Sequence, residues 1–395
     1  MDFQIFIKPI GSACNLNCSY CYYSGKNNLY KSSPVHLMGE DLMEQYIVQH
    51  IEAAESDEVM FSWHGGEPLL AGIDFYKKAL ELQRKHLPNG CRLINGIQTN
   101  GTLLDEEWCS FLASENFLTG ISIDGPARLH NFYRMDHSGE GTFEEVLQGY
   151  KMLQQFGITS EILCVVHSQN VNHPLEVYNF FKSIGARFIT FIPLVERLPG
   201  SPTGVTPDSV PAEAFGNFLV SVFDEWIEND IGVIQVQIFE EALRPAFNRD
   251  HTLCIFKKEC GRVPVVEHNG DFYACDHYVD NRHRIGNIRN KSIPQLLDSP
   301  EQKAFGRRKS ETLPDYCLQC QVKEMCNGEC PKNRFIRTPD GEPGLNYLCS
   351  GYQIFFQYFK PFAMAVRQLS DKSDIETITG KDEKADVKNE PGYEF

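Results

Sequence analysis

Short β-rich runs alternate with stretches of helical hydrophobic periodicity over the first half of this 395-residue chain. Runs of β-branched and aromatic residues predict strands, whereas apolar residues recurring every three or four positions predict amphipathic helices. Repeated strand–helix units indicate a parallel sheet with right-handed crossovers. The predicted strands cover residues 3–7, 59–63, 92–98, 118–123, 161–166 and 188–192, and the predicted helices between them cover 40–54, 74–86, 103–115, 142–156 and 173–184.

Glycine-containing polar motifs lie at the carboxyl ends of three of the predicted strands. They are His64-Gly-Gly-Glu-Pro68, Gln98-Thr-Asn-Gly101 and Ser122-Ile-Asp-Gly-Pro126. Each motif alone is typical of a turn or a helix cap. In a barrel of strand–helix units, however, chemistry gathers at the carboxyl ends of the strands. The motifs are therefore candidates for a ligand site.

The N-terminal cysteines Cys14, Cys18 and Cys21 have the spacing C-x3-C-x2-C. Three thiolates on one short loop can hold three irons of a [4Fe–4S] cluster and leave the fourth iron open to a small molecule, whereas such clusters are commonly held by four cysteines. The alternative is a structural zinc site, which requires four ligands, usually arranged in C-x2-C pairs. The loop provides neither, so its spacing favours a reactive iron–sulfur cluster.

A second group of cysteines lies in the C-terminal half of the chain. The 14 cysteines occur without a signal-peptide pattern, which indicates metal or redox chemistry rather than disulfides. Eight thiols suffice for two fully ligated [4Fe–4S] clusters, and a zinc ribbon is the alternative for the closely spaced members. The eight are Cys254, Cys260, Cys275, Cys317, Cys320, Cys326, Cys330 and Cys349.

The charge and hydropathy of the chain narrow the function classes. The formal net charge of −16 argues against a nucleic-acid partner, because binding to phosphates needs basic surface. No apolar run is as long as a membrane span, and without a signal peptide the expected location is the cytoplasm. A linker is predicted at 199–211 and an amphipathic helix at 212–229, while the charged segment 371–395 is predicted to be a disordered tail.

The N-terminal motifs together resemble those of radical S-adenosylmethionine (SAM) enzymes. Cys14, Cys18 and Cys21, with Tyr20 before the last, resemble the cluster loop of that superfamily. The resemblance implies a partial (βα)6 TIM-like barrel over residues 1–235, in which SAM binds the open iron and reduction releases a 5′-deoxyadenosyl radical. It also implies that SAM is contacted through Tyr20, Gly65, Gly66, Glu67, Ser122, Arg134 and Val195.

The C-terminal cysteines are similar to those of a SPASM domain, expected over residues 236–370 with two auxiliary [4Fe–4S] clusters. The resemblance implies that Cys254, Cys260, Cys275 and Cys330 hold the first cluster and Cys317, Cys320, Cys326 and Cys349 the second. Spacing alone does not decide this pairing. Asp276 and His277 follow Cys275, and this run resembles anaerobic sulfatase-maturating enzymes, in which the aspartate takes the proton of the substrate. An aspartate here could also serve only to stabilise its loop.

The resemblance implies oxidation of a Cys or Ser side chain in an unfolded sulfatase to Cα-formylglycine. A flavodoxin or ferredoxin would supply the electron, the radical would remove a hydrogen atom from Cβ, and Asp276 would accept the proton. The alternatives are a SPASM enzyme that forms thioether or carbon–carbon crosslinks in a precursor peptide, and an electron-transfer protein that does not bind SAM. The choice between Cys and Ser, the sulfatase served, the oligomeric state and the role of His64 stay open at this point.

Overall fold

The computed structural model describes residues 3–30 and 37–379 of the chain. Its main sheet contains the strands β1 (Phe6–Lys8), β2 (Glu58–Trp63), β3 (Arg92–Thr99), β4 (Leu118–Ser122), β5 (Ser160–Val166), β6 (Phe188–Pro193), β7 (Gln235–Val236), β8 (Val265–Glu267), β9 (Asp271–Tyr273) and β10 (Arg284–Asn287). A separate hairpin consists of β11 (Arg334–Arg337) and β12 (Pro343–Asn346).

The helices follow the strands in the order that the hydrophobic periodicity predicts. Those of the first half are α1 (Glu40–Ala53), α2 (Ile73–His86), α3 (Glu106–Ser114), α4 (Ala127–His130), α5 (Phe143–Gln155), α6 (Pro174–Ser183), α7 (Ala212–Asn229) and α8 (Gln237–Leu243). Those of the second half are α9 (Ile293–Leu297), α10 (Pro300–Glu311), α11 (Asp315–Leu318), α12 (Lys323–Cys326) and α13 (Cys349–Thr379). Short 3-10 helices are η1 (Ser24–Tyr30), η2 (Pro68–Ala71), η3 (Arg244–Phe247), η4 (Asp276–Tyr278) and η5 (Pro331–Asn333).

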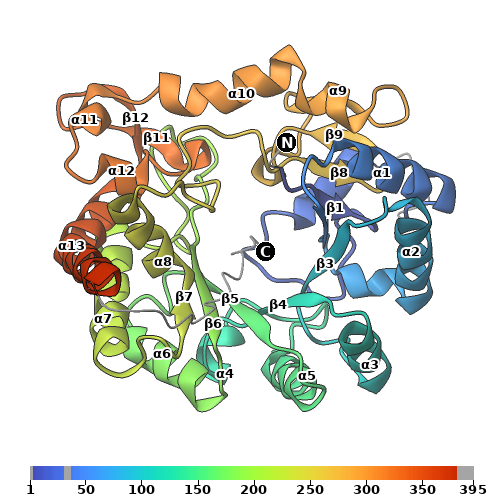
Figure 1. The fold of residues 1–395 in the computed structure, drawn as a ribbon, viewed down its shortest axis with the longest axis horizontal. Helices are drawn as coiled ribbons and strands as arrows, with labels where there is room; N and C mark the ends of the chain where they lie inside the picture. The colour runs from blue at the N-terminus through green and yellow to red at the C-terminus, as the bar shows by residue number, and fades with distance from the viewer. Residues whose placement is uncertain (1–2, 31–36, 380–395) are drawn as a thin grey trace.

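The sheet confirms the predicted α/β architecture of a curved, partly closed barrel. Its strand order is β10-β9-β8-β1-β2-β3-β4-β5-β6-β7, and every pair from β8–β1 to β6–β7 is parallel. The helices lie on the outside of the curve (Figure 1). The carboxyl ends of the parallel strands therefore share one rim, where the predicted motifs lie.

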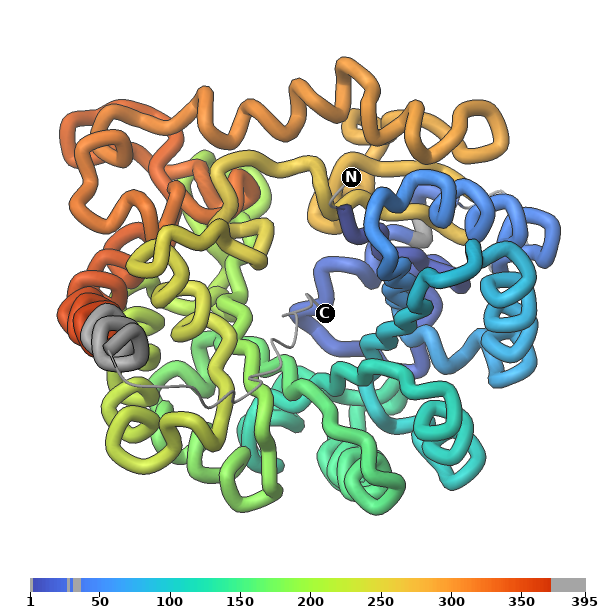
Figure 2. The backbone as a smooth tube through the Cα atoms, viewed as in Figure 1, coloured from blue at the N-terminus to red at the C-terminus, as the bar shows by residue number. Residues whose placement is uncertain are grey.

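The second half of the chain joins the same sheet, which sequence patterns did not predict. β8 pairs in parallel with β1, so that Ile7 lies opposite Val266 and Lys8 opposite Glu267. β9 and β10 then extend the sheet as antiparallel strands. Figure 2 shows this yellow-to-orange part of the chain lying beside the blue N-terminal part. The region after Cys254 is therefore built onto the first barrel strand.

Helix α13 attaches the C-terminal half of the chain to the barrel at a second place. It packs on α7 (Figure 1), where a Cβ atom on Gly351 would lie 2.0 Å from the carbonyl oxygen of Ala212. The two helices approach so closely because glycine has no side chain at the crossing. α13 continues to Thr379, past residue 371 where the sequence predicts the charged tail to begin; residues 380–395 of that tail lie outside the described residues.

The core is rich in large aromatic side chains that the alternating pattern places inward. Trp63, Tyr46, Tyr76 and Tyr178 are fully buried between the sheet and its helices. Each such side chain removes a large apolar surface from water. In the described part of the chain, no helix is long and apolar enough to cross a lipid bilayer.

Candidate functional site: two cysteine regions meeting at Asp276

The N-terminal cysteine loop is fastened to the segment that follows α4. Leu16 forms an isolated β-bridge with Asp136, and the N–H of Asn17 donates to the carbonyl oxygen of Met135 at 2.8 Å. Cys21 N–H donates to Cys18 C=O at 3.0 Å, which closes the end of the loop into a turn. The three thiols are thus presented at the rim where β1 ends.

The two glycines predicted to contact SAM, Gly65 and Gly66, allow the backbone to pack closely beside the cysteine loop. Gly66 N–H donates to Gly11 C=O at 2.9 Å, and a Cβ atom on Gly66 would lie 2.0 Å from the carbonyl oxygen of Ala13. Gly65 has a φ of +153°, a backbone conformation that L side chains rarely adopt. The pair therefore allows the β2 turn to lie directly against the loop that carries Cys14.

The carboxylate of Glu67, the next predicted SAM contact, accepts hydrogen bonds from other groups of the chain. Its Oε1 accepts hydrogen bonds from Leu69 N–H and Thr99 Oγ1, and its Oε2 accepts one from Asn100 N–H at 2.7 Å. The side chain is fully buried. Burial raises the pKa of Glu67 to about 7, although these hydrogen bonds lower it. Glu67 therefore ties the ends of β2 and β3 together.

Tyr20 and Arg134 meet at a carboxylate that was not among the predicted site residues. Arg134 Nε lies 2.9 Å from Asp124 Oδ2, and the hydroxyl of Tyr20 donates to the same oxygen. Burial alone would raise the pKa of Asp124, but the charge of Arg134 and two nearby histidines hold it below its usual value. Asp124 thus fixes two expected SAM contacts near Cys18, because the charge of Arg134 lowers the pKa of that thiol against the effect of burial.

Ser122 and Val195 lie at neighbouring strand ends of the same rim. Ser122 Oγ accepts a hydrogen bond from Gln98 Nε2 at 3.1 Å, which joins the third- and fourth-strand motifs. Val195 is buried just after β6, and within the described residues its peptide N–H and C=O make no hydrogen bond to other backbone groups. This leaves the peptide groups available for an adenine contact of the kind the resemblance implies.

Asp276 lies where the two halves of the chain meet. Lys8 Nζ, on β1, lies 2.8 Å from Asp276 Oδ1, and the hydroxyl of Tyr22 donates to Oδ2. Tyr22 directly follows Cys21, and Asp276 directly follows Cys275. Burial alone would raise the pKa of Asp276, but Lys8, His277 and Tyr22 outweigh it and lower the pKa to about 2. The carboxylate is therefore ionised at neutral pH.

His64 completes the surroundings of Asp276. Its ring stacks on Phe6 with centroids 4.0 Å apart, and it is buried. Burial and the charge of Lys8 lower the pKa of His64 to about 3, so the imidazole is neutral. Its Nε2 has no hydrogen-bond partner within the described chain.

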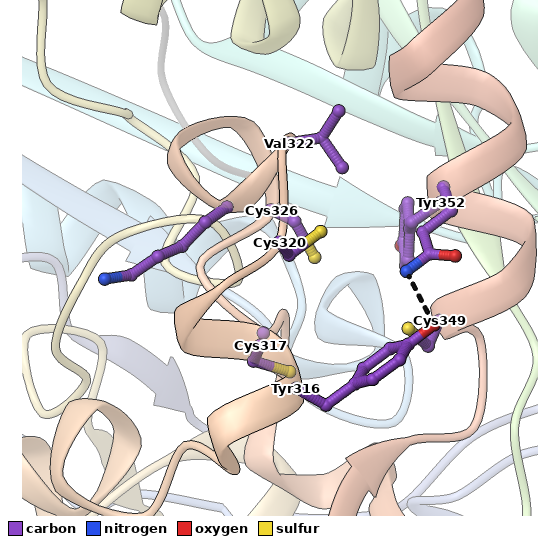
Figure 3. A pocket seen from close by; sticks show the side chains of 10 residues that line it. Tyr316, Cys317, Cys320, Val322, Cys326, Cys349 and Tyr352 are labelled. Carbon is purple, nitrogen blue, oxygen red and sulfur yellow. Dashed lines mark hydrogen bonds between the residues drawn. The ribbon is translucent and has the colours of Figure 1, made fainter. Parts of the chain in front are cut away.

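Four C-terminal cysteines line one pocket. Figure 3 shows the sulfur atoms of Cys317, Cys320, Cys326 and Cys349 directed toward a shared space beside the first turn of α13. The pocket has an empty volume of about 330 Å³, part of it open to solvent. Burial, with Cys317 and Cys320 nearby, raises the pKa of Cys349 to about 12. These four residues are the set that the resemblance assigns to the second auxiliary cluster.

The other four C-terminal cysteines are Cys254, Cys260, Cys275 and Cys330. Burial, with Cys330 and Cys260 nearby, raises the pKa of Cys275 well above its usual value. Lys309 links the fourth cysteine, Cys254, to the others. Its Nζ donates to the carbonyl oxygen of Cys254 at 2.8 Å, and its charge acts on the thiol of Cys330. Cys260, Cys275 and Cys330, far apart in sequence, thus lie near one another, and the assignment of all four to one cluster stays a prediction.

The donor set suits iron–sulfur clusters. Among the described residues, no three His, Cys, Asp or Glu side chains are close enough to hold a single metal ion. A [4Fe–4S] cube spreads its cysteine ligands farther apart than a single ion does, and the 14 cysteines, all among the described residues, form no disulfide. Three thiols beside the SAM rim and two groups of four therefore fit three clusters.

Comparisons with known proteins agree with this arrangement. The family described as the Radical SAM superfamily matches residues 9–181, and the family described as an iron–sulfur cluster-binding domain, SPASM, matches residues 258–321. The serine-type anaerobic sulfatase-maturating enzyme of Bacteroides thetaiotaomicron is 43% identical over 91% of this chain and 89% of its own. This chain belongs to the anaerobic sulfatase-maturating enzymes.

Further members of the anaerobic sulfatase-maturating enzymes align over a similar length. The serine-type enzyme of Klebsiella aerogenes is 36% identical over 90% of this chain and 85% of its own. The cysteine-type enzyme of Clostridium perfringens strain 13 is 32% identical over 91% of this chain and 96% of its own. The solved structure of native anSMEcpe with bound AdoMet and Cp18Cys peptide has a TM-score of 0.84 at 32% identity, covering 93% of this chain and 99% of that one.

Three residues around Asp276 and the barrel rim were not predicted from the sequence as site residues. They are Lys8, Tyr22 and Asp124, which contact predicted site residues directly. Asp124 lies inside the motif Ser122-Ile-Asp-Gly-Pro126 and Tyr22 directly follows Cys21, so their positions were a usable signal. Lys8 carried no such signal, because a lysine at the end of an apolar strand normally faces solvent.

Proposed function

We propose that this protein oxidises a serine or cysteine side chain of an unfolded sulfatase to Cα-formylglycine. The observation that carries the proposal is the contact between Tyr22 and Asp276. Tyr22 adjoins Cys21 of the SAM loop and Asp276 adjoins Cys275 of the auxiliary region. A peptide side chain near this contact is therefore close to both the SAM loop and the auxiliary cysteines. The oxidation needs both, because it removes one hydrogen atom, one proton and one further electron from the side chain. Serine then gives the aldehyde directly, whereas cysteine gives a thioaldehyde that water hydrolyses to the aldehyde with release of hydrogen sulfide.

The cofactors supply the radical step, and the chain supplies position. When bound to Cys14, Cys18 and Cys21, the reduced cluster and SAM provide the group that removes a hydrogen atom. Arg134 and Tyr20, fixed by Asp124, lie where the carboxylate and ribose end of SAM is expected. Gly65, Gly66 and Glu67 shape the turn on which its methionine end would rest, Ser122 lies beside its ribose, and Val195 offers peptide groups to adenine.

Asp276 is proposed as the proton acceptor. Its pKa of about 2 keeps it ionised, so it needs no prior loss of a proton. A low pKa makes a weak base toward an intact hydroxyl or thiol. The side chain becomes far more acidic once its Cβ carbon has lost a hydrogen atom, so a weak base suffices at that stage. The remaining electron would leave on the Cys275 side.

Serine is the favoured target residue, because the relatives of higher identity are serine-type enzymes. A flavodoxin or ferredoxin is the proposed electron donor. The cytoplasm is the proposed location, because free thiols and iron–sulfur chemistry suit a reducing compartment.

The test is an anaerobic reaction with SAM, a reductant and two sulfatase-motif peptides that differ only in Ser or Cys at the target position. We expect both 5′-deoxyadenosine and a peptide mass loss that corresponds to an aldehyde, with the Ser peptide converted faster. Deoxyadenosine without peptide oxidation would overturn the substrate assignment and return the crosslinking alternative.

A further inference from the structure

The segment that follows β6 carries a glutamate, Glu196, whose backbone is firmly held. Its N–H donates to Ser209 Oγ at 2.9 Å. Its carbonyl oxygen accepts hydrogen bonds from Thr206 N–H at 2.8 Å and from Ser209 Oγ at 3.2 Å. Glu196 directly follows Val195, the residue expected beside the adenine of SAM. The Glu196 side chain therefore starts from a fixed point at the rim of the barrel.

The carboxylate of Glu196 reaches the second half of the chain. Its Oε1 lies 2.7 Å from Nζ of Lys332, which belongs to η5. The two side chains are 34% and 25% exposed, so the pair is partly solvated and contributes little to stability. Beside this pair, the guanidinium carbon of Arg197 lies 5.0 Å from the ring centre of Phe335. These contacts tie the end of β6 to the region after Cys330.

Lys332 also faces Tyr22, whose hydroxyl donates to Asp276. The Lys332 Nζ atom lies 5.8 Å from the centre of the Tyr22 ring, within the range of a cation–π contact. Tyr22 is 41% exposed, so packing alone does not fix its ring. Its orientation depends on the groups that touch it, among them the His277 ring at a centroid distance of 5.5 Å.

We infer that Glu196 is a positioning residue for the Tyr22–Asp276 contact and acts through Lys332. Glu196 holds the ammonium group of Lys332 at the Tyr22 ring, and the ring in turn keeps its hydroxyl on the Asp276 carboxylate. The inference rests on the proposed function for the role of Asp276 as proton acceptor. It adds the residues that align this carboxylate with the strand end where SAM is expected. Such alignment matters, because a displacement of about 1 Å at a reacting group can lower a rate by about 10²-fold.

The experiment compares the full-length wild-type holoenzyme with Glu196→Gln, which keeps the shape of the side chain and removes its charge. Aldehyde formation from the Ser peptide is measured by mass spectrometry, and deoxyadenosine formation is measured by chromatography. The affinity for a fluorescently labelled Ser peptide is measured separately, with SAM but without reductant, so that no turnover occurs. Glu225→Gln is the matched control, because Glu225 forms a similarly exposed pair with Lys182 at 2.8 Å.

We expect Glu196→Gln to lower kcat for aldehyde formation by about threefold to tenfold, the size of a lost exposed ion pair and cation–π contact. Deoxyadenosine formation, peptide affinity, iron content and unfolding temperature should stay at their wild-type values, so more deoxyadenosine is formed per aldehyde. Glu196→Asp, which keeps the charge, should retain most of the wild-type aldehyde yield. Glu225→Gln should behave as the wild type.

Lys332→Met tests the route from Glu196 to Tyr22. It should cause a similar loss of aldehyde formation, and Glu196→Gln should add little further loss in the Lys332→Met background. The inference would be overturned by a wild-type aldehyde yield in Glu196→Gln, by an equal loss in Glu225→Gln, or by losses that multiply in the double variant. A fall in peptide affinity or iron content that accounts for the lost aldehyde would also overturn it. Failure of the proposed function is seen separately, because the wild type would then form no aldehyde.

Discussion

Lys8 and Asp276 form a buried ion pair, with 2.8 Å between Nζ and Oδ1, that joins the first barrel strand to the residue following Cys275. Lys8 is 2% exposed, and its Nζ also lies 4.3 Å from the centre of the Tyr23 ring. Tyr23 in turn donates to the buried carboxylate of Glu267 on β8. Removal of one member of a buried pair leaves an uncompensated charge, which typically costs about 3–5 kcal/mol. The pair therefore holds the proposed base in place as well as ionised.

Replacement of Asp276 by Asn should stop aldehyde formation without stopping SAM cleavage. The amide cannot accept a proton, and loss of a general base typically lowers the rate by about 10²–10⁴-fold. Deoxyadenosine formation and iron content should persist, because no proposed cluster or SAM ligand changes. Aldehyde yield by mass spectrometry and deoxyadenosine by chromatography measure the two steps separately.

The control for Asp276→Asn is Asp280→Asn, which alters a partly exposed carboxylate four residues further along the same segment. It should keep wild-type aldehyde formation. Equal aldehyde yields from the wild type and Asp276→Asn would remove the role of Asp276 as the base.

Replacement of Lys8 by Met should make aldehyde formation sensitive to acid. In the wild type, the folded-state pKa of Asp276 is lowered to about 2, so the carboxylate is ionised at every pH above about 3. Without Lys8, the effect of burial is less opposed and raises that pKa. Activity should then be lost as the pH falls through the raised value, and should recover as the pH rises. The measurement is kcat/KM for the Ser peptide against pH.

A matched control is Lys182→Met, which removes a lysine paired with Glu225 and Asp230 away from the cysteines. Its pH profile should follow that of the wild type. If the Lys8→Met profile has no added acid limb, Lys8 does not set the ionisation of Asp276.

Local sequence signals predicted most of the barrel, because each strand–helix unit has its own hydrophobic period. They also placed the motifs at residues 64–68 and 122–126 at the carboxyl ends of strands of a parallel sheet, where the structure has them. They did not predict the β1–β8 pair, in which Phe6 lies opposite Val265. A three-residue apolar run pairs equally well with many others, and only the folded chain selects the partner.

The roles of individual site residues were harder to predict than their location. Glu67 was expected to belong to the motif that binds SAM, and this stays a prediction, while its two oxygens bind Leu69, Thr99 and Asn100 within the chain. The sequence shows that a carboxylate follows two glycines, but not which donors surround it. The Lys8–Asp276 pair is a similar case, because its members are 268 residues apart.

Replacement of Gly66 by Ala should selectively impair the N-terminal cluster. The added methyl group would overlap the backbone carbonyl of Ala13, next to Cys14, and backbone cannot yield as a flexible side chain does. We expect the iron content to fall from about twelve toward about eight per chain, the amount held by two remaining cubes. Iron and sulfide analysis, with SAM binding, measures this loss. Gly25→Ala is the control, because nothing lies within 4 Å of the added carbon; an iron content of Gly66→Ala equal to that of Gly25→Ala would contradict the prediction.

Replacement of His64 by Phe should stabilise the protein and impair its activity. The Nε2 atom of His64 is buried without a partner in the described chain, and an unpaired buried polar atom costs about 1–3 kcal/mol. Phenylalanine keeps the stack on Phe6 and removes that cost, so the unfolding temperature should rise. A peptide side chain near Asp276 would lose a hydrogen-bond partner, which should lower kcat/KM for the Ser peptide by about tenfold or more.

The matched control for His64→Phe is His50→Phe. His50 is also buried and stacks on Phe61 at 4.5 Å, but its Nδ1 is paired with the hydroxyl of Tyr46 at 3.2 Å. The same substitution there breaks a hydrogen bond, so the unfolding temperature should fall while peptide turnover at permissive temperature stays at the wild-type level. Anaerobic thermal unfolding of the two variants therefore has opposite expected signs. A His64→Phe variant that is stabilised and fully active would show that the unpaired nitrogen does not serve the substrate.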